Sequence, residues 1–167
     1  WMPLILIGLA AVASSGPIKP IAGLIYETES AYNFIQVVER GSTRYLLLNE
    51  GQGLHSIYNP DNLITNGTWD YFLVAPFFNA PTFTPADVKS LGLVGLAAGT
   101  ISKQYTAVFG PIPIDGIEID PAIVQVGRDY FDMNELNLNV IVEDGRWALA
   151  HSPNIYTVVG VDAYRLP

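Results

Sequence analysis

Three carboxylates stand at the ends of apolar runs in the second half of the chain. They are Glu118 in the run of residues 112–119, Asp144 after residues 138–142 and Asp162 after residues 156–161. Such runs are typical of buried parallel strands, and the carboxyl ends of parallel strands meet at one edge of a sheet. We therefore expect the three acids to converge on one cleft, which suits a cationic, ribose-bearing substrate.

Glu118 has the clearest chemistry of the three acids. It lies 19 residues after Gly99. A carboxylate at the end of a second strand can accept both hydroxyls of a ribose, because its two oxygens match a vicinal diol. We expect no other partner for it at such a crevice. Asp120 is better explained as the N-cap of a helix that opens at Pro121.

The other two acids are also candidates for the site. Asp144 is followed by Gly145. Its carboxylate could accept a hydrogen bond from the exocyclic amine of an adenine, could cap the next helix, or could do both. Asp162 is expected at the end of the fourth strand, where it faces the same crevice.

A glycine turn precedes these acids. The stretch GLVGLAAGT at residues 92–100 places Gly95 and Gly99 between an apolar strand and a helix. Glycine there lets a ligand approach the backbone closely, and the helix N-terminus presents amide groups to it. The dinucleotide fingerprint G-x-G-x-x-G is not met, because Ala97 stands in place of the second glycine. A tight strand–helix connection without a ligand is the alternative.

Strands and helices alternate from residue 88 onward. This order predicts an α/β fold in which helices cover both faces of a parallel sheet. The strands expected at residues 91–95, 112–119, 138–142 and 156–161 make about half of a doubly wound sheet, which we expect to be incomplete. An open apolar edge is a liability, so we expect a homo-oligomer or a partner chain to cover it.

Two domains are expected after the opening segment. Residues 85–167 would form the first half of a nucleoside-binding domain, and residues 25–80 a small β-rich domain with an antiparallel β-hairpin. The elements expected in the small domain are strands at residues 32–39, 44–49 and 54–58 and a helix at residues 69–78.

The opening of the chain is apolar and uncharged. No Asp, Glu, Lys or Arg occurs before Lys19. Residues 1–18 are at the lower edge of the length that spans a bilayer, and we expect residues 1–24 to be a membrane-associated segment. A signal-peptide-like region and a buried strand or helix are the alternatives. The first residue is Trp1, which we interpret as the start of a fragment or of a processed product.

Composition excludes several classes of function. Sixteen acidic against eight basic residues give a net charge of −8, which disfavours nucleic-acid binding. The absence of cysteine excludes a disulfide framework, a thiolate metal site and a cysteine nucleophile. His55 and His151 lie far apart in the sequence, so we expect no metal site.

Three motifs together resemble the spermidine synthase (polyamine aminopropyltransferase) family, over residues 32–167. They are EIDP at residues 118–121, EDGR at residues 143–146 and VDAY at residues 161–164. The small β-domain ahead of them is similar to that family's N-terminal domain, and the apolar opening looks like the membrane-fused bacterial type. The resemblance implies a class I methyltransferase-like, Rossmann-like sheet.

The resemblance also implies an activity. An aminopropyl group would pass from decarboxylated S-adenosylmethionine, a co-substrate and not a tightly bound cofactor, to a small-molecule amine. Glu118 would bind the ribose hydroxyls, Asp144 with Gly145 the adenine, and Asp162 would take the proton of the attacking amine. The protein would be membrane-associated and bacterial, with its soluble domain in the cytoplasm.

The chain departs from the family pattern at three places. The turn at residues 95–99 lacks the usual acid, residues 32–33 read YN where the family has Tyr-Gln, and residues 69–71 read WDY in place of a Tyr-His-Glu-like pattern. Two alternatives to an active aminopropyltransferase therefore stay open. One is an S-adenosylmethionine-dependent methyltransferase, and the other is a non-catalytic subunit of a membrane assembly.

Overall fold

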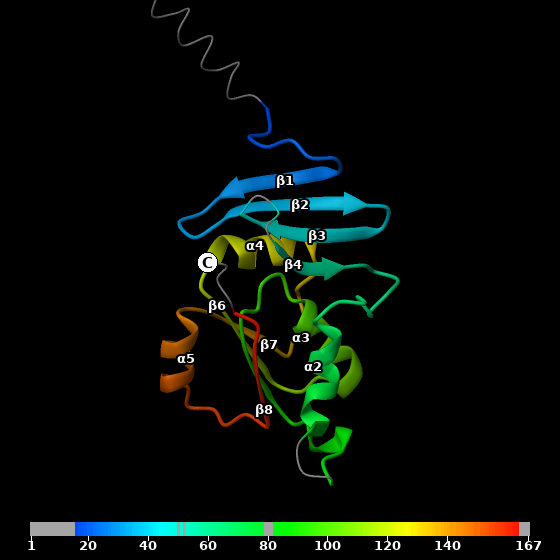
Figure 1. Ribbon diagram of the computed structural model, residues 1–167. Coiled ribbons are helices and arrows are strands. Elements are labelled where there is room, and N and C mark those ends of the chain that lie inside the picture. Colours follow the sequence, from blue (N-terminus) through cyan, green and yellow to red (C-terminus); the bar gives the residue numbers. More distant parts are fainter. Residues whose placement is uncertain (1–15, 50, 52, 79–81, 164–167) are drawn as a thin grey trace, which may run out of the picture.

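A computed structural model describes residues 16–49, 51, 53–78 and 82–163 of the chain. It contains two four-stranded sheets, one antiparallel and one parallel, which lie one above the other in Figure 1. The antiparallel strands are β1 (Leu24–Glu29), β2 (Phe34–Arg40), β3 (Thr43–Leu48) and β4 (Gly53–Tyr58), in that order across the sheet. The predicted hairpin is β2–β3, whose register pairs Val37 with Leu46.

β1 is a strand that the sequence prediction missed. Residues 24–26 continue the apolar opening segment, and Glu27 and Glu29 lower the strand propensity of the rest. Pairing with β2 forms the strand, since Thr28 lies opposite Ile35 in an antiparallel register. β1 therefore depends on its neighbour in the sheet more than on its own sequence.

The helix expected at residues 69–78 is present but changes type along its length. It is α2 (Asp70–Val74), continued by the 3-10 turn η1 (Ala75–Phe78). Pro76 has no amide hydrogen, so it cannot extend the α-helical hydrogen-bond ladder. A second 3-10 turn, η2 (Pro85–Asp87), leads into the parallel sheet.

Asp70 fixes the loop that precedes α2. Its carboxylate accepts hydrogen bonds from the backbone amides of Thr65 and Asn66 and from the side chain of Gln104. Burial opposes the charge, but these hydrogen bonds outweigh that effect and lower the pKa of Asp70. The middle residue of the altered WDY pattern therefore has a structural role.

The parallel sheet confirms the predicted α/β class. Its strands are β5 (Leu91–Val94), β6 (Ile114–Glu118), β7 (Leu138–Val142) and β8 (Val158–Val161), and its helices are α3 (Thr100–Phe109), α4 (Pro121–Tyr130) and α5 (Gly145–His151). The strand order is β7-β6-β5-β8. The winding direction thus reverses between β5 and β8, and ligands of such sheets bind in the crevice at the carboxyl ends of the strands where this reversal occurs.

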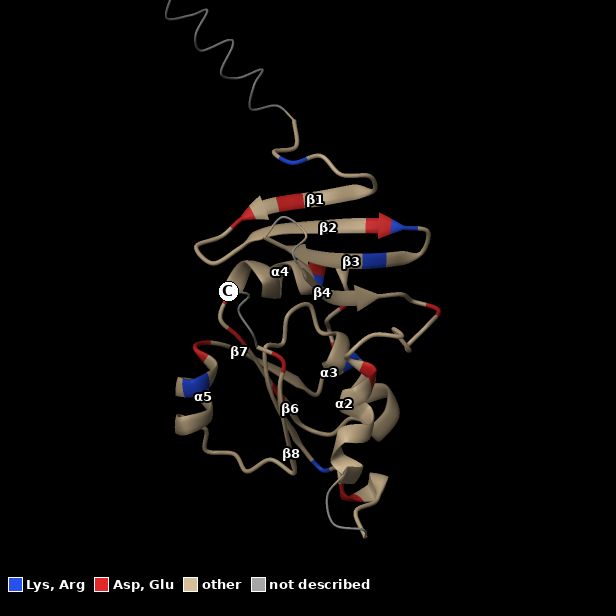
Figure 2. Ribbon diagram, viewed as in Figure 1, with Lys and Arg blue, Asp and Glu red and all other residues tan. Residues whose placement is uncertain are grey.

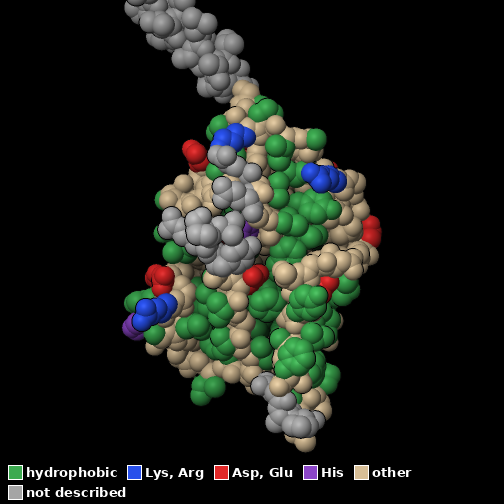
Figure 3. Space-filling view, in the orientation of Figure 1, with side chains coloured by type: hydrophobic (Ala, Val, Ile, Leu, Met, Phe, Trp, Pro, Cys, Tyr) green, Lys and Arg blue, Asp and Glu red, His purple; other side chains and the backbone are tan. Residues whose placement is uncertain are grey.

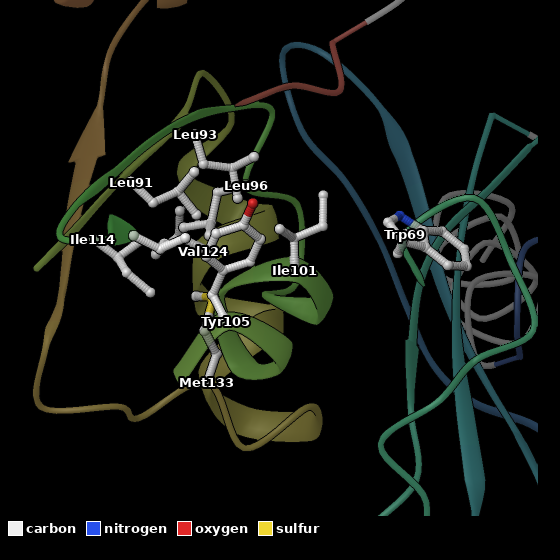
Figure 4. Close-up of a cluster of buried hydrophobic side chains, with 10 residues drawn as sticks. Trp69, Leu91, Leu93, Leu96, Ile101, Tyr105, Ile114, Val124 and Met133 are labelled. Carbon is white, nitrogen blue, oxygen red and sulfur yellow. The ribbon is translucent and has the colours of Figure 1, made fainter. Parts of the chain in front are cut away.

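One core fills the space between the parallel sheet and helices α3 and α4. Figure 4 shows most of its side chains pointing toward one another around Tyr105. Tyr105 is fully buried, its hydroxyl donates to the Phe72 carbonyl oxygen at 2.7 Å, and burial raises the pKa of Tyr105 to about 12. A smaller cluster of Val94, Ile117 and Ala148 packs under α5. Helices therefore cover both faces of the sheet.

A further core joins the two sheets. Ile35, Val37 and Leu46 of the antiparallel sheet pack with Ile123 and Phe131, which lie in α4 and directly after it. Helix α4 therefore belongs to the packing of both sheets, and it lies between them in Figure 1.

Asp120 adds hydrogen bonds to this junction. Its Oδ1 accepts from the Ala122 amide at 3.0 Å, which confirms the predicted N-cap of α4. Its Oδ2 accepts from Ser30 Oγ at 2.5 Å and from Asn33 Nδ2 at 3.0 Å, in the turn between β1 and β2. The side chain is fully buried. Loss of the carboxylate would therefore leave these donors unpaired, because water does not reach them.

β8 lies at an edge of the described parallel sheet. Val159 and Val161 are 53% and 61% exposed on it. Figure 3 shows apolar side chains gathered on this face of the molecule, over β8 and α2. Coverage of the edge by a second copy or by a partner chain stays a prediction.

The predicted membrane segment, residues 1–24, falls largely on residues 1–15, which lie outside the described residues. Within the described ranges, no helix combines the length and the apolar character that crossing a bilayer requires. Membrane association through residues 1–18 therefore stays a prediction.

We expect Asp120→Ala to lower the free energy of unfolding by about 2–4 kcal/mol, because it removes an N-cap and leaves buried donors unpaired. Urea denaturation followed by circular dichroism measures the change. The matched control is Asp129→Ala, which removes an exposed acid from the same helix and should cost less than about 0.5 kcal/mol. Equal losses in the two variants would contradict the role given to Asp120.

Candidate functional site

The predicted site residues lie along one rim, at the carboxyl ends of the parallel strands. Hydrogen bonds join neighbouring strand ends: Asp162 N to Val94 O at 2.8 Å, Gly95 N to Ile117 O at 2.9 Å, and Glu143 N to Glu118 O at 3.2 Å. Along this rim the order is therefore Asp144, Glu118, Gly95 and Asp162. Figure 2 shows acidic residues at this end of the sheet, which faces the antiparallel sheet.

Glu118 is the most buried of the three acids, with 8% of its surface exposed. Its Oε2 accepts from the Ala97 amide at 2.9 Å and its Oε1 from the Asp120 amide at 3.1 Å. Burial raises the pKa of Glu118, although these two hydrogen bonds oppose the shift. The expectation that Glu118 has no other partner is wrong, because two loops approach it closely enough to donate their amides.

The glycine turn uses all of its own amides inside the protein. Gly95 N and Leu96 N donate to Ile117 O, Ala97 N to Glu118 Oε2, Ala98 N to Ser56 Oγ, and Gly99 N to Leu96 O. The amides of residues 95–99 are therefore used inside the protein, where the turn packs on itself, on Glu118 and on β4. Presentation of amides to a ligand by the helix N-terminus that follows stays a prediction.

Close packing explains three of the predicted glycines. Gly95 and Gly99 have φ of +83° and +90°, a conformation that side chains disfavour. An added Cβ would lie 2.5 Å from the Asp162 carbonyl oxygen at Gly95, and against Val94 at Gly145. Strand ends and α5 can approach one another at this rim because these residues lack side chains. Binding of a nucleoside by Gly95, Gly99 and Gly145 stays a prediction.

Asp144 is exposed at the start of α5. Its Oδ1 accepts from the Trp147 amide at 2.9 Å, so Asp144 caps the helix, as one of the two alternatives predicts. Among the described residues, no hydrogen bond occupies its Oδ2. An adenine amine at that oxygen is compatible with the cap and stays a prediction.

Asp162 is partly buried, and Trp69 lies near enough to its carboxyl to lower its pKa slightly. Burial is the larger effect and raises the pKa of Asp162. The sequence offers no signal for this contact, because the two residues are far apart along the chain and neither belongs to a local pattern with the other. Trp69 itself is buried.

The three acids lie on one rim. Two cavities lined by described residues have volumes of about 30 Å³, between β4 and α3, and about 350 Å³, beside β7 and α5. Neither of these two includes Glu118, Asp144 or Asp162. Convergence of the three acids on one cleft stays a prediction.

No protein-family model matches the chain. A probable polyamine aminopropyl transferase from Bifidobacterium longum (strain NCC 2705) is 32% identical over 142 residues, which is 85% of this chain and 30% of that protein. A probable spermidine synthase from Corynebacterium glutamicum ATCC 13032 superposes with a TM-score of 0.66 and 18% identity, over 87% of this chain and 53% of that one. A spermidine synthase in complex with the transition-state analogue AdoDATO superposes with a TM-score of 0.61 and 14% identity, over 84% and 47%.

These matches confirm the resemblance that the three motifs predict. The fold is that of the spermidine synthases, a small antiparallel sheet followed by a Rossmann-like parallel sheet. In sequence, the chain is similar to a probable polyamine aminopropyl transferase. It spans 30% of the length of that relative and about half of the matched spermidine synthases. The membrane-fused type is not indicated by these matches.

We expect Gly95→Ala to lower the free energy of unfolding by about 2–4 kcal/mol, because the new methyl group would meet the Asp162 carbonyl oxygen at a positive φ. Gly41→Ala is the matched control, since Gly41 has φ of +61° and open space around its Cβ. Backbone strain alone should cost that control about 1 kcal/mol. Urea denaturation measures both losses, and equal values would show that contact with Asp162 does not matter.

Proposed function

We propose that this chain is an aminopropyltransferase-like domain, which transfers an aminopropyl group from decarboxylated S-adenosylmethionine to a small-molecule amine. The observation that carries the proposal is the acidic rim at the strand reversal of a spermidine synthase-like sheet. Sequence similarity to a probable polyamine aminopropyl transferase supports it.

An S-adenosylmethionine-type co-substrate is supported by the AdoDATO complex of one structurally similar spermidine synthase. Each Glu118 oxygen accepts one backbone amide and has a second lone pair, which would accept a ribose hydroxyl. Asp144 would receive the adenine amine at Oδ2 while Oδ1 caps α5. Gly95, Gly99 and Gly145 would let the nucleoside approach the rim through carbon contacts, because they carry no side chains.

Asp162 would be the general base. The amine nitrogen attacks the methylene carbon of the aminopropyl group that is bonded to the sulfonium. The bond between that carbon and sulfur breaks, and its electron pair stays on sulfur, which becomes a neutral thioether. The proton of the attacking amine passes to Asp162, whose raised pKa makes its carboxylate a stronger base than an exposed one. The rate should fall as the pH drops through this raised pKa, because a protonated carboxyl cannot take the proton.

The proposal is tested by calorimetric titration of the chain with decarboxylated and with intact S-adenosylmethionine. We expect the decarboxylated form to bind about tenfold more tightly, because the acids of the rim repel a carboxylate. Preference for the intact form would instead favour a methyltransferase, for which the missing acid in the turn at residues 95–99 is the supporting observation. If neither form binds, the result would favour the alternative of a non-catalytic subunit of a membrane assembly.

Two isosteric variants separate binding from chemistry. Asp144→Asn can still cap α5, and we expect it to weaken nucleoside binding by about 1–2 kcal/mol through loss of a charged acceptor. Asp162→Asn keeps the shape of the side chain and removes its charge, and we expect it to slow transfer about 10²–10⁴-fold while binding stays within about twofold.

Asp129 is an exposed acid on α4, and Asp129→Asn is the control for both variants. It should change neither nucleoside binding nor the rate of transfer. Calorimetry measures the binding, and the amount of aminopropylated amine formed measures the transfer. Turnover at the parent rate in Asp162→Asn would remove that residue from the mechanism.

A further inference from the structure

Two buried hydroxyl side chains join the glycine turn to the antiparallel sheet. Ser56 of β4 is 1% exposed, and its Oγ accepts from the Ala98 amide at 3.0 Å. Thr100, the first residue of α3, is 6% exposed. Its Oγ1 accepts from the Ile57 amide and donates to the Ile57 carbonyl oxygen, both at 3.0 Å. The end of the turn and the start of α3 are therefore bonded to one strand of the small domain.

Thr100 completes the edge of β4. This strand is the last in the order β1-β2-β3-β4, so one side of its backbone has no neighbouring strand among the described residues. The Thr100 hydroxyl pairs with both the donor and the acceptor of Ile57, as a residue of a further antiparallel strand would. Loss of the hydroxyl would leave these backbone groups unpaired, and it would release the start of α3 from β4.

Ala97 is held in a conformation that its side chain disfavours. Its φ is +49°, in the left-handed region where residues other than glycine are uncommon. A residue stays in that region only when its surroundings determine it. In this conformation the Ala97 amide donates to Glu118 Oε2 at 2.9 Å. Ala98 follows directly and is bonded to Ser56, so the contact with β4 stabilises the backbone that reaches Glu118.

Gly99 leaves the turn no room to change its path by adding a side chain. Its φ is +90°, and an added Cβ would lie 2.6 Å from Met133 Cγ. Met133 is itself buried. Between Ala98 and Thr100 the chain therefore packs closely on Met133, while the residues on either side of Gly99 are bonded to β4.

We propose that Ser56 and Thr100 are positioning residues for Glu118, because they fix the turn on β4 where the Ala97 amide meets the Glu118 carboxylate. Both act through the turn, since the donors at 2.9 and 3.1 Å from the Glu118 oxygens are backbone amides. The consequence for ribose binding rests on the proposed function. The effect on the Glu118 carboxylate itself does not.

The first test is the pKa of Glu118, followed by carboxyl-carbon NMR of the full chain as the pH changes. An amide that donates to the ionised carboxylate lowers its pKa. We expect Thr100→Val to weaken the donation by Ala97 and therefore to raise the pKa of Glu118. Thr100→Ser keeps the hydroxyl and should restore the parent value.

Thr106→Val is the matched control, because it removes a hydroxyl from the same helix. Thr106 Oγ1 donates to the Ser102 carbonyl oxygen at 2.9 Å and accepts from Asn137 Nδ2 at 3.1 Å. The control therefore loses one donated and one accepted hydrogen bond away from the turn. We expect it to leave the pKa of Glu118 at the parent value.

The second test is calorimetric titration with decarboxylated S-adenosylmethionine. Thr100→Val should bind it about threefold to tenfold more weakly, the effect of about one hydrogen bond. Thr100→Ser and Thr106→Val should bind it within about twofold of the parent. If the parent does not bind the nucleoside, the proposed function fails, whereas the comparison of Glu118 pKa values still decides the positioning role.

An equal pKa of Glu118 in Thr100→Val and in the parent would overturn the proposal. An equal rise in Thr100→Val and Thr106→Val would overturn it as well, because it would indicate a general loss of packing. If Thr100→Val fails to fold by near-ultraviolet circular dichroism, Ser56→Ala takes its place, since it removes the acceptor of the Ala98 amide. An unchanged pKa of Glu118 in Ser56→Ala then contradicts the positioning role.

Discussion

A buried carboxylate with backbone partners is the constraint on which this structure depends. Glu118 accepts one amide from the glycine turn and one from the loop that enters α4. Displacement of either loop would leave a buried charge without its donor, which costs more than the hydrogen bond itself contributes. From the same loop, Asp120 reaches Ser30 and Asn33. Two acids therefore tie the end of β6 to the glycine turn and to the antiparallel sheet.

The three acids of the rim differ in burial and in hydrogen-bond partners. Glu118 is buried and fixed, so any part it has in binding uses the lone pairs that its amide partners leave. Asp162 lies beside Trp69 at the strand reversal, half-buried and with a raised pKa, which suits a group that exchanges a proton. Asp144 is exposed, its Oδ1 caps α5, and its Oδ2 accepts no hydrogen bond from the described residues. Three acids of one charge type thus differ in chemistry because their burial differs.

Local sequence patterns predicted much of the fold, but they could not predict contacts between residues that lie far apart in the chain. The apolar spacing of residues 100–109 and the Asp120-Pro121 pair carry enough signal for α3 and for the start of α4. β1 was not predicted because glutamates are typical of loops more than of strands. Only pairing with β2 makes this segment a strand. The Ala97 amide donates to Glu118, and Trp69 lies near Asp162, yet neither pair shares a sequence pattern. The position of the candidate residues at the strand ends was therefore predicted from the sequence, whereas their partners were not.

The central claim is that an adenine nucleoside lies along the rim from Asp144 to Asp162. A crystal structure of the chain with decarboxylated S-adenosylmethionine tests it most directly. We predict density for the ribose hydroxyls within hydrogen-bond distance of Glu118, the adenine beside Asp144, and the sulfonium near Asp162. Density for the nucleoside in the cavity beneath α5, or at any place away from these three residues, would contradict the claim.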